Sequence, residues 1–208
     1  MYSIIFPVFA LISLIPSILL PYRRLSKRDL FFWSMLALAV IVTLSLTLVR
    51  QSAGWKTDLS TALWLTILTC LILHTVVAII SKDGWRLTPL LMPYLFILGS
   101  LAIILTDTNP DQFMINNAPT AWVSTHIFVS ILTYGLITLS AIATLAASIQ
   151  SRALKSKKRT SLSTLLPSVA SSEKLVLRFL FSGELVLTVG LITGIALSYL
   201  SDGKVIVF

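Results

Sequence analysis

The side chains with the clearest chemical potential in this sequence are two histidines and one carboxylate inside apolar runs. His126 lies near the start of a run with almost no charge, and Ser130 follows one helical turn later on the same helix face. An ionisable ring in so apolar a helix costs free energy unless it faces a bundle interior or a wet cavity, so His126 is a candidate site residue. The simpler alternative is that His126 only hydrogen-bonds a neighbouring helix. Trp122, one turn earlier, could line the same site or anchor the helix end at headgroup depth.

His74 and Glu184 lie inside two other apolar runs. His74 is about 9–10 Å from one membrane face and His126 is about 5–8 Å from the other, at 1.5 Å per residue. In a core of ~30 Å their depths differ too much for both rings to ligate one haem iron. We therefore expect separate ligands, or one ligand and a structural partner, with His74 as the structural residue. Glu184 could be neutral, or it could pair with a cation or with His74.

The composition requires an integral membrane protein. Apolar residues make up 56% of the 208 residues and charged residues only 12%, more apolar surface than a soluble domain of this size can bury. The net charge of +8 does not indicate nucleic-acid binding, because the cations lie in short links between apolar runs. The single cysteine, Cys70, sits inside such a run and cannot form an internal disulfide.

Six apolar runs are long enough to be spanning helices, and none alternates like a barrel strand. The predicted fold is therefore one all-α integral membrane domain over residues 1–208, a bundle of six transmembrane helices. The predicted helices cover residues of about 4–20, 30–49, 59–80, 90–106, 122–150 and 176–200.

The cations are segregated between the two ends of these runs. Thirteen of the 16 lysines and arginines fall in alternate links, and the other three are Arg50, Lys56 and Lys204. By the positive-inside rule the cation-rich links face the cytoplasm of an inner (plasma) membrane, and both termini lie on the outer, periplasmic side. The segment 107–121, which has no cation, then forms an outer loop beside His126.

The predicted cytoplasmic loop 151–174 begins with the basic run Arg152–Arg159. Such a run favours contact with anionic lipid headgroups, worth about 1 kcal/mol per cation near the surface. In the last predicted helix, Gly190-x-x-x-Gly194 forms a smooth ridge that should pack against a neighbouring helix.

The segments AWVSTHIFVSILTYGLITLSAIATLAASIQ and EKLVLRFLFSGELVLTVGLITGIALSY, with LLP between them, resemble the cytochrome c assembly transmembrane family. The nearest branch is the HemX/YpjD type, related to CcsA. The shared features are the His126-Ile127 pair with Ser130, the basic link, the LLP and a helix ending in Thr193-Gly194. The hydropathy order of residues 4–110 also follows the family.

This resemblance implies haem as a cofactor, with His126 as the candidate axial ligand of its iron and a membrane protein of cytochrome biogenesis as partner. The chain departs from the family in three ways. This chain has six apolar runs, whereas relatives usually have about eight helices. It lacks the histidine that relatives often carry in the second helix. It also lacks the tryptophan-rich loop of haem-delivery members. Only His126 carries over cleanly, so synthase activity is not expected.

Three functions remain in competition. The first is an accessory haem-binding or haem-transfer role, with His126, Ser130, Trp122 and His74 as site residues. The second is a non-catalytic membrane scaffold or assembly partner without haem, and the third is a small transporter that couples protons through Glu184 and His74. The sequence shows no nucleophile–base pair, phosphate loop or metal-ligand cluster, which argues against an enzyme.

The predicted topology can be tested by cysteine labelling. In a variant with Cys70 replaced, a cysteine in the basic run should react with an impermeant maleimide only after cells are permeabilised, because that run is cytoplasmic. A cysteine in the outer loop is the control and should react in intact cells. Labelling of the basic run from the periplasmic face would refute the model.

Overall fold

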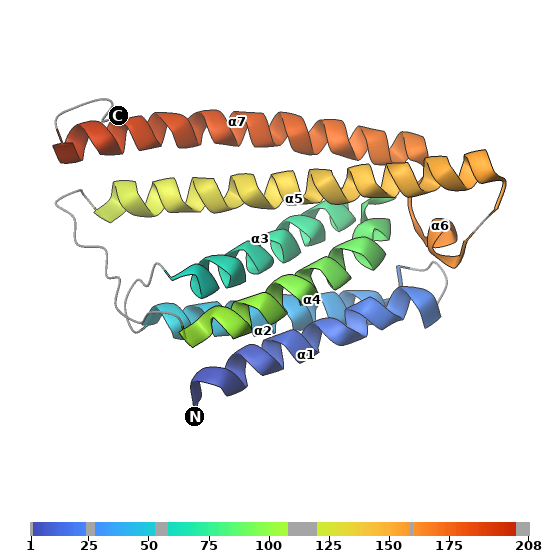
Figure 1. The fold of residues 1–208 in the computed structure, drawn as a ribbon, viewed down its shortest axis with the longest axis horizontal. Helices are drawn as coiled ribbons and strands as arrows, with labels where there is room; N and C mark the ends of the chain where they lie inside the picture. The colour runs from blue at the N-terminus through green and yellow to red at the C-terminus, as the bar shows by residue number, and fades with distance from the viewer. Residues whose placement is uncertain (1, 24–27, 53–57, 108–119, 159, 203–208) are drawn as a thin grey trace.

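The computed structural model contains helices and no strands in the residues that it describes, which are 2–23, 28–52, 58–107, 120–158 and 160–202 (Figure 1). The order along the chain is α1 (Tyr2–Arg23), α2 (Leu30–Ser52), α3 (Leu59–Ile80), η1 (Gly84–Leu87), α4 (Thr88–Ile104), η2 (Leu105–Asp107), α5 (Thr120–Ser156), α6 (Ser161–Leu165) and α7 (Val169–Asp202).

Helix ends follow local signals in the sequence. The Asp58 side chain accepts a hydrogen bond from the main-chain N–H of Thr61 and so caps the start of α3. α4 begins with Pro89, whose missing N–H costs nothing in a first turn. Between α3 and η1 the chain turns so tightly that a Cβ on Gly84 would lie 2.6 Å from Val77 Cγ1 and 2.8 Å from its carbonyl oxygen. Only glycine fits there.

By length and composition, five helical segments of the described chain could cross a membrane: α2, α3, η1 with α4, α5, and α7. The apolar part of α1, Ile5–Leu19, is shorter. Many large apolar side chains lie exposed on the outer surface of the bundle, as expected where lipid is the solvent. The predicted all-α membrane bundle is confirmed, while the sidedness of its termini stays a prediction.

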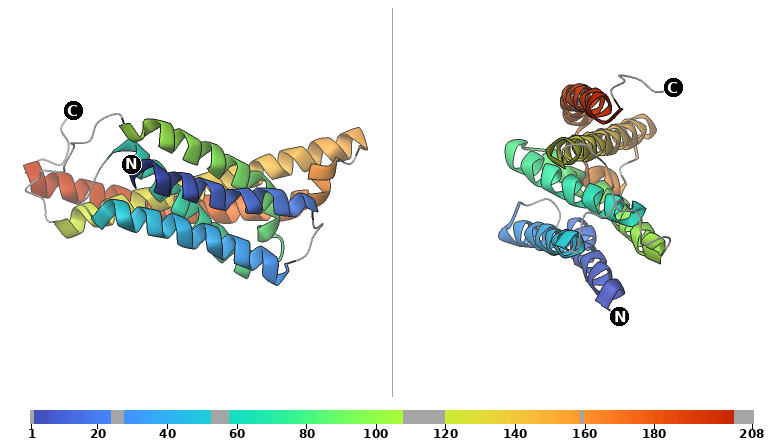
Figure 2. Two further views of the ribbon diagram at one scale, coloured as in Figure 1. Left: turned by 90° about the horizontal axis from the view of Figure 1, so that it is seen from below. Right: turned by 90° about the vertical axis from the view of Figure 1, so that its left-hand side faces the viewer.

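The helices form two groups (Figures 1 and 2). α5 and α7 run side by side as a long antiparallel pair, and they share more contacts than any other two elements. α1, α2, α3 and α4 form the other group, in which α3 also packs against α5. The core is continuous across this junction, from Trp64, Ile67 and Leu71 on α3 to Leu139 and Ala143 on α5.

The region after residue 150 differs from the predicted loop 151–174. α5 continues to Ser156, α6 forms a short turn of helix, and α7 begins at Val169. The fall in hydropathy at residue 151 marks where the apolar span ends, but lysine, arginine and alanine are good helix formers and continue the same helix. The Ser168 side chain accepts from the Ser171 N–H at the start of α7, which begins several residues before the predicted apolar span of about 176–200.

The predicted glycine ridge on the last helix does pack against a neighbour, and that neighbour is α5. A Cβ on Gly190 would lie 3.2 Å from Val129 Cγ1, and one on Gly194 would lie 3.0 Å from the His126 ring. A Cβ on Gly183 would lie 3.7 Å from Leu136 Cβ. Absent side chains at these positions let the two backbones approach closely, which is how small residues drive helix association in lipid.

Gly190→Leu should wedge α5 and α7 apart and lower the free energy of unfolding by about 1–3 kcal/mol, as overpacking does. The measurement is thermal unfolding in detergent. Val189→Leu is the matched control, because Val189 is exposed and a leucine there adds volume away from the contact between α5 and α7. Equal stability of the two variants would show that the Gly190 face is not a packed interface.

Candidate functional site

His126 lies at the seam between the two long helices. It sits in the second turn of α5, and its ring lies against Gly194 of α7, where a Cβ would come 3.0 Å from Cε1 and 3.5 Å from Nδ1. Nδ1 is 3.3 Å from the Thr193 hydroxyl oxygen. The side chain is half-buried and faces α7 instead of lipid. The ring thus faces a neighbouring helix, as the simpler alternative also predicts, and its role as a site residue stays a prediction.

The hydrogen bonds around Thr193 define which nitrogen of His126 carries the proton. The Thr193 hydroxyl donates its single hydrogen to the Gly190 carbonyl oxygen at 2.9 Å. Its oxygen is then placed to accept from Nδ1–H of His126, and in a neutral ring that tautomer leaves the lone pair of Nε2 free. Among the described residues the structure gives Nε2 no hydrogen-bond partner. This is the arrangement in which an imidazole can ligate a metal.

The position of Ser130 one turn after His126 predicts a hydrogen bond from its hydroxyl to a ring nitrogen of the histidine, and the structure does not show that bond. Ser130 donates to the main-chain carbonyl oxygen of His126 at 2.8 Å, the usual i−4 bond of a serine in an apolar helix, so it does not orient the ring. Thr193 does so instead. Trp122 lies one turn before His126 with 41% of its surface exposed, and the residues 108–119 expected to cap this end lie outside the described residues.

His74 occupies a different place. It is completely buried in α3, and its Nε2 is 2.9 Å from the Thr88 hydroxyl at the start of α4. Thr88 donates to the Trp85 carbonyl, so Nε2 of His74 is the donor. Nδ1 is left enclosed without a partner among the described residues. The ring thus ties α3 to α4, and the structure does not bring it to His126.

Glu184 is exposed on α7, whereas His74 is fully buried in the other helix group. The structure therefore does not join the two groups that the transporter hypothesis requires. In the described part of the chain, no three histidine, cysteine or acidic side chains cluster as metal ligands.

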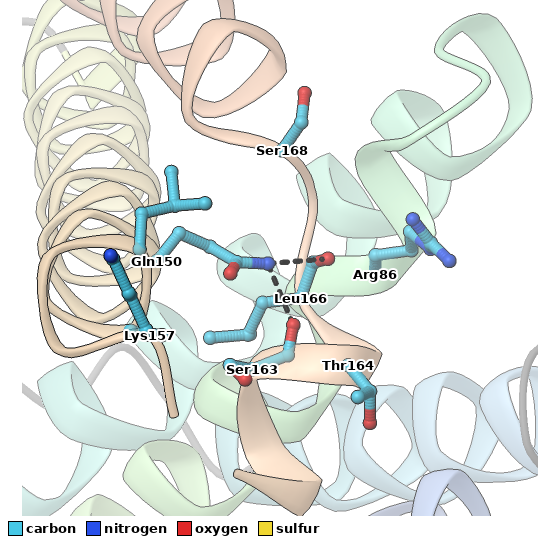
Figure 3. A pocket seen from close by; sticks show the side chains of 9 residues that line it. Arg86, Gln150, Lys157, Ser163, Thr164, Leu166 and Ser168 are labelled. Carbon is cyan, nitrogen blue, oxygen red and sulfur yellow. Dashed lines mark hydrogen bonds between the residues drawn. The ribbon is translucent and has the colours of Figure 1, made fainter. Parts of the chain in front are cut away.

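A cavity of about 500 Å³ is lined in part by Gln150 and Ala153, near the end of α5 opposite to His126. Figure 3 shows the side chains that line it. Gln150 of α5 projects into it and donates from Nε2 to the carbonyl oxygens of Ser163 at 2.7 Å and Leu166 at 3.2 Å. Two cations, Arg86 and Lys157, belong to its lining, which contains no carboxylate. This end carries the basic run, so the cavity is electropositive.

Lys157 adopts a left-handed backbone conformation, with φ of 53°, just past the end of α5. Glycine or asparagine usually occupies this position after a helix, because a side chain there is strained. The conformation reverses the chain toward α6 and leaves the lysine on the cavity wall. The sequence pattern did not predict this cavity, because the residues that line it come from separate segments in α5, α6 and η1.

Sequence reasoning also missed Thr193 as the partner of His126. The Thr193-Gly194 pair was visible as a shared family feature and as part of the glycine ridge. Its relation to His126 required knowing that α7 packs on α5 in this register, since 67 residues separate the histidine from the threonine.

Comparisons with known proteins agree with the membrane fold. Residues 27–203 match the family described as cytochrome C assembly protein. A curated relative from Azospirillum brasilense, an uncharacterized 28.8 kDa protein in the nifR3-like 5′ region, is 39% identical over 209 residues, covering 98% of this chain and 77% of the relative. No solved structure matches the chain. Because the family match spans most of the sequence, this multi-pass membrane protein belongs to the cytochrome c assembly protein family.

Proposed function

We propose that this protein is an accessory haem-binding or haem-transfer protein of the inner membrane in cytochrome c biogenesis. Membership of the cytochrome c assembly family supports a haem-handling role in general. The single observation that carries the finer proposal is the state of His126: Nδ1 is held by Thr193, and the lone pair of Nε2 has no partner among the described residues.

The residues around His126 fit a role as one axial ligand. Haem would supply an iron that accepts an imidazole nitrogen. Thr193 fixes the ring and its tautomer, as the outer hydrogen-bond partner of a metal-bound histidine does. Gly194 leaves room for the ring against the α7 backbone. Trp122 stands at the same end of α5 and could provide an aromatic wall, while Ser130 contributes only through the helix backbone.

His74 is not a second ligand in this proposal. Its ring is enclosed in the core and its Nε2 hydrogen is used by Thr88. Of the two histidines in the printed sequence, His74 is committed to Thr88, so a second histidine ligand would have to lie outside these residues. This favours transfer of haem to a partner over permanent storage, and it assigns the chain no catalytic step of its own.

The electropositive end fits contact with the cytoplasmic leaflet. Lys157 and Arg86 line the cavity, and Arg152, Lys155 and Lys158 are exposed at the same end of α5. We infer that anionic lipid headgroups bind here, since each cation near such a surface contributes about 1 kcal/mol. This lipid contact would hold the cytoplasmic ends of α5 and α7 at the membrane surface.

Haem binding can be tested by absorption spectroscopy of the purified protein after haem supplementation. His126→Ala should abolish the Soret band, because it removes the only nitrogen placed to ligate iron. His74→Gln is the control and should keep the band, because glutamine can still donate to Thr88. The reverse pattern would move the site to α3, and a wild-type protein without a Soret band would favour a scaffold without haem.

Gly194→Ala tests the placement of the ring. The added methyl group would lie 3.0 Å from Cε1, so the ring must shift by a few tenths of an ångström and its bond to Thr193 must lengthen. Haem affinity should fall roughly fivefold, about 1 kcal/mol, in a titration followed at the Soret band. Gly183→Ala is the matched control, because its methyl group meets Leu136 at an ordinary 3.7 Å. Equal affinities would show that haem does not depend on this ring position.

A further inference from the structure

One face of α7 is turned away from the rest of the described protein. Phe179, Gly183, Gly190 and Thr193 are buried and define the side that meets α5. On the opposite side, Leu185 and Ile192 are exposed. Six further exposed residues lie at alternating spacings of four and three, which is the spacing of a helix–helix seam. They are Leu177, Phe181, Glu184, Thr188, Leu191 and Ile195.

Glu184 lies in the middle of this stripe. It is six residues past Arg178, about 9 Å deeper along the helix, and eighteen residues, about 27 Å, before Asp202. In a hydrocarbon core of ~30 Å this position is well inside the membrane. The nearest stripe residues are the apolar Phe181, which is 70% exposed, and the polar Thr188, and Leu191 at 64% exposure follows one turn after Thr188.

The described part of the chain offers the Glu184 carboxyl group no partner. The nearest hydroxyl on the stripe, that of Thr188, donates to the main-chain carbonyl of Glu184 and is therefore already engaged. No cation of the described residues forms an ion pair with this carboxyl group. Ionisable groups inside a membrane are expensive and pair with one another or face a protein interior, so a cationic partner from outside the described residues would stabilise a carboxyl group turned outward from the bundle.

We propose that a transmembrane helix of another membrane protein packs on this stripe and places a lysine, arginine or histidine against Glu184. The spacing of the stripe lets a partner helix pack along it. The carboxyl group selects a partner with a cation, because an interhelical ion pair removes the free-energy cost that lipid imposes on both charges. A second copy of this chain would set Glu184 against Glu184 in a symmetric parallel contact, so like charge disfavours it. This interface is independent of haem binding at His126, which lies on the other side of α7.

The probe for this interface is a pair of synthetic leucine-rich transmembrane peptides, identical except for a lysine or a leucine at the depth of Glu184. The full-length protein carries Phe181→p-benzoylphenylalanine and is reconstituted with each peptide in zwitterionic vesicles for photocrosslinking. The control carries the same photoreactive group at Val189, which is exposed but off the stripe. Thermal unfolding checks that each variant is folded.

The lysine peptide should crosslink at position 181 several-fold more than the leucine peptide. This preference should disappear with Glu184→Gln, which keeps the size of the side chain but removes its charge, and it should be absent at position 189. Three results would overturn the proposal: equal yields for the two peptides, a lysine preference that survives Glu184→Gln, or a crosslinked dimer of this chain that excludes both peptides.

Discussion

The close approach of α5 and α7 is the constraint on which the candidate site depends. Lipid tails are as apolar as leucine, so these helices associate through packing and hydrogen bonds. Glycines at 183, 190 and 194 let the α7 backbone lie directly against α5 side chains. The same register sets Thr193 beside Nδ1 of His126. A bulky residue at position 194 would clash with the His126 ring before the ring could hydrogen-bond Thr193. The close packing of the two helices and the hydrogen bond of the ring therefore depend on the same small residue.

The two histidines show how burial separates structural from available groups. Each donates a ring N–H to a threonine on another helix, and each threonine passes its own hydrogen to a nearby carbonyl. The remaining nitrogen of His74 is enclosed in the core, whereas that of His126 lies at a half-buried seam near the helix end. Because an enclosed nitrogen cannot meet a ligand without opening the core, the shared bonding pattern leads to different roles.

Polar side chains elsewhere in the bundle are largely satisfied locally. Thr43, Thr66 and Thr75, for example, donate to the carbonyl four residues earlier in their own helices. An exception at the end of α2 is Arg50, which donates to Ser60 and Thr106 and so joins α2, α3 and η2. Because these hydroxyl groups are hydrogen-bonded within their own helices, most serines and threonines form no hydrogen bond to a neighbouring helix. Ser130 follows the same rule and donates to its own helix instead of the histidine ring.

The sequence by itself determined the class of protein and the approximate position of its helices. A run of about twenty apolar residues can satisfy its backbone in lipid only as a helix, so composition and run length fixed the all-α membrane fold. The same logic, with the family resemblance, singled out His126 and the glycine ridge. It failed after residue 150, because hydropathy reports where lipid contact ends and helix propensity decides where the helix ends.

Only the tertiary structure decided which groups meet. Apolar helices carry little information about their neighbours, because many rotations about each axis bury similar surfaces. The partner of His126 proved to be Thr193 instead of Ser130, a contact set by the α5–α7 register. Likewise Glu184 could be placed inside the membrane from its position in the chain, but its outward direction followed from the seam that glycines place on the opposite side of α7.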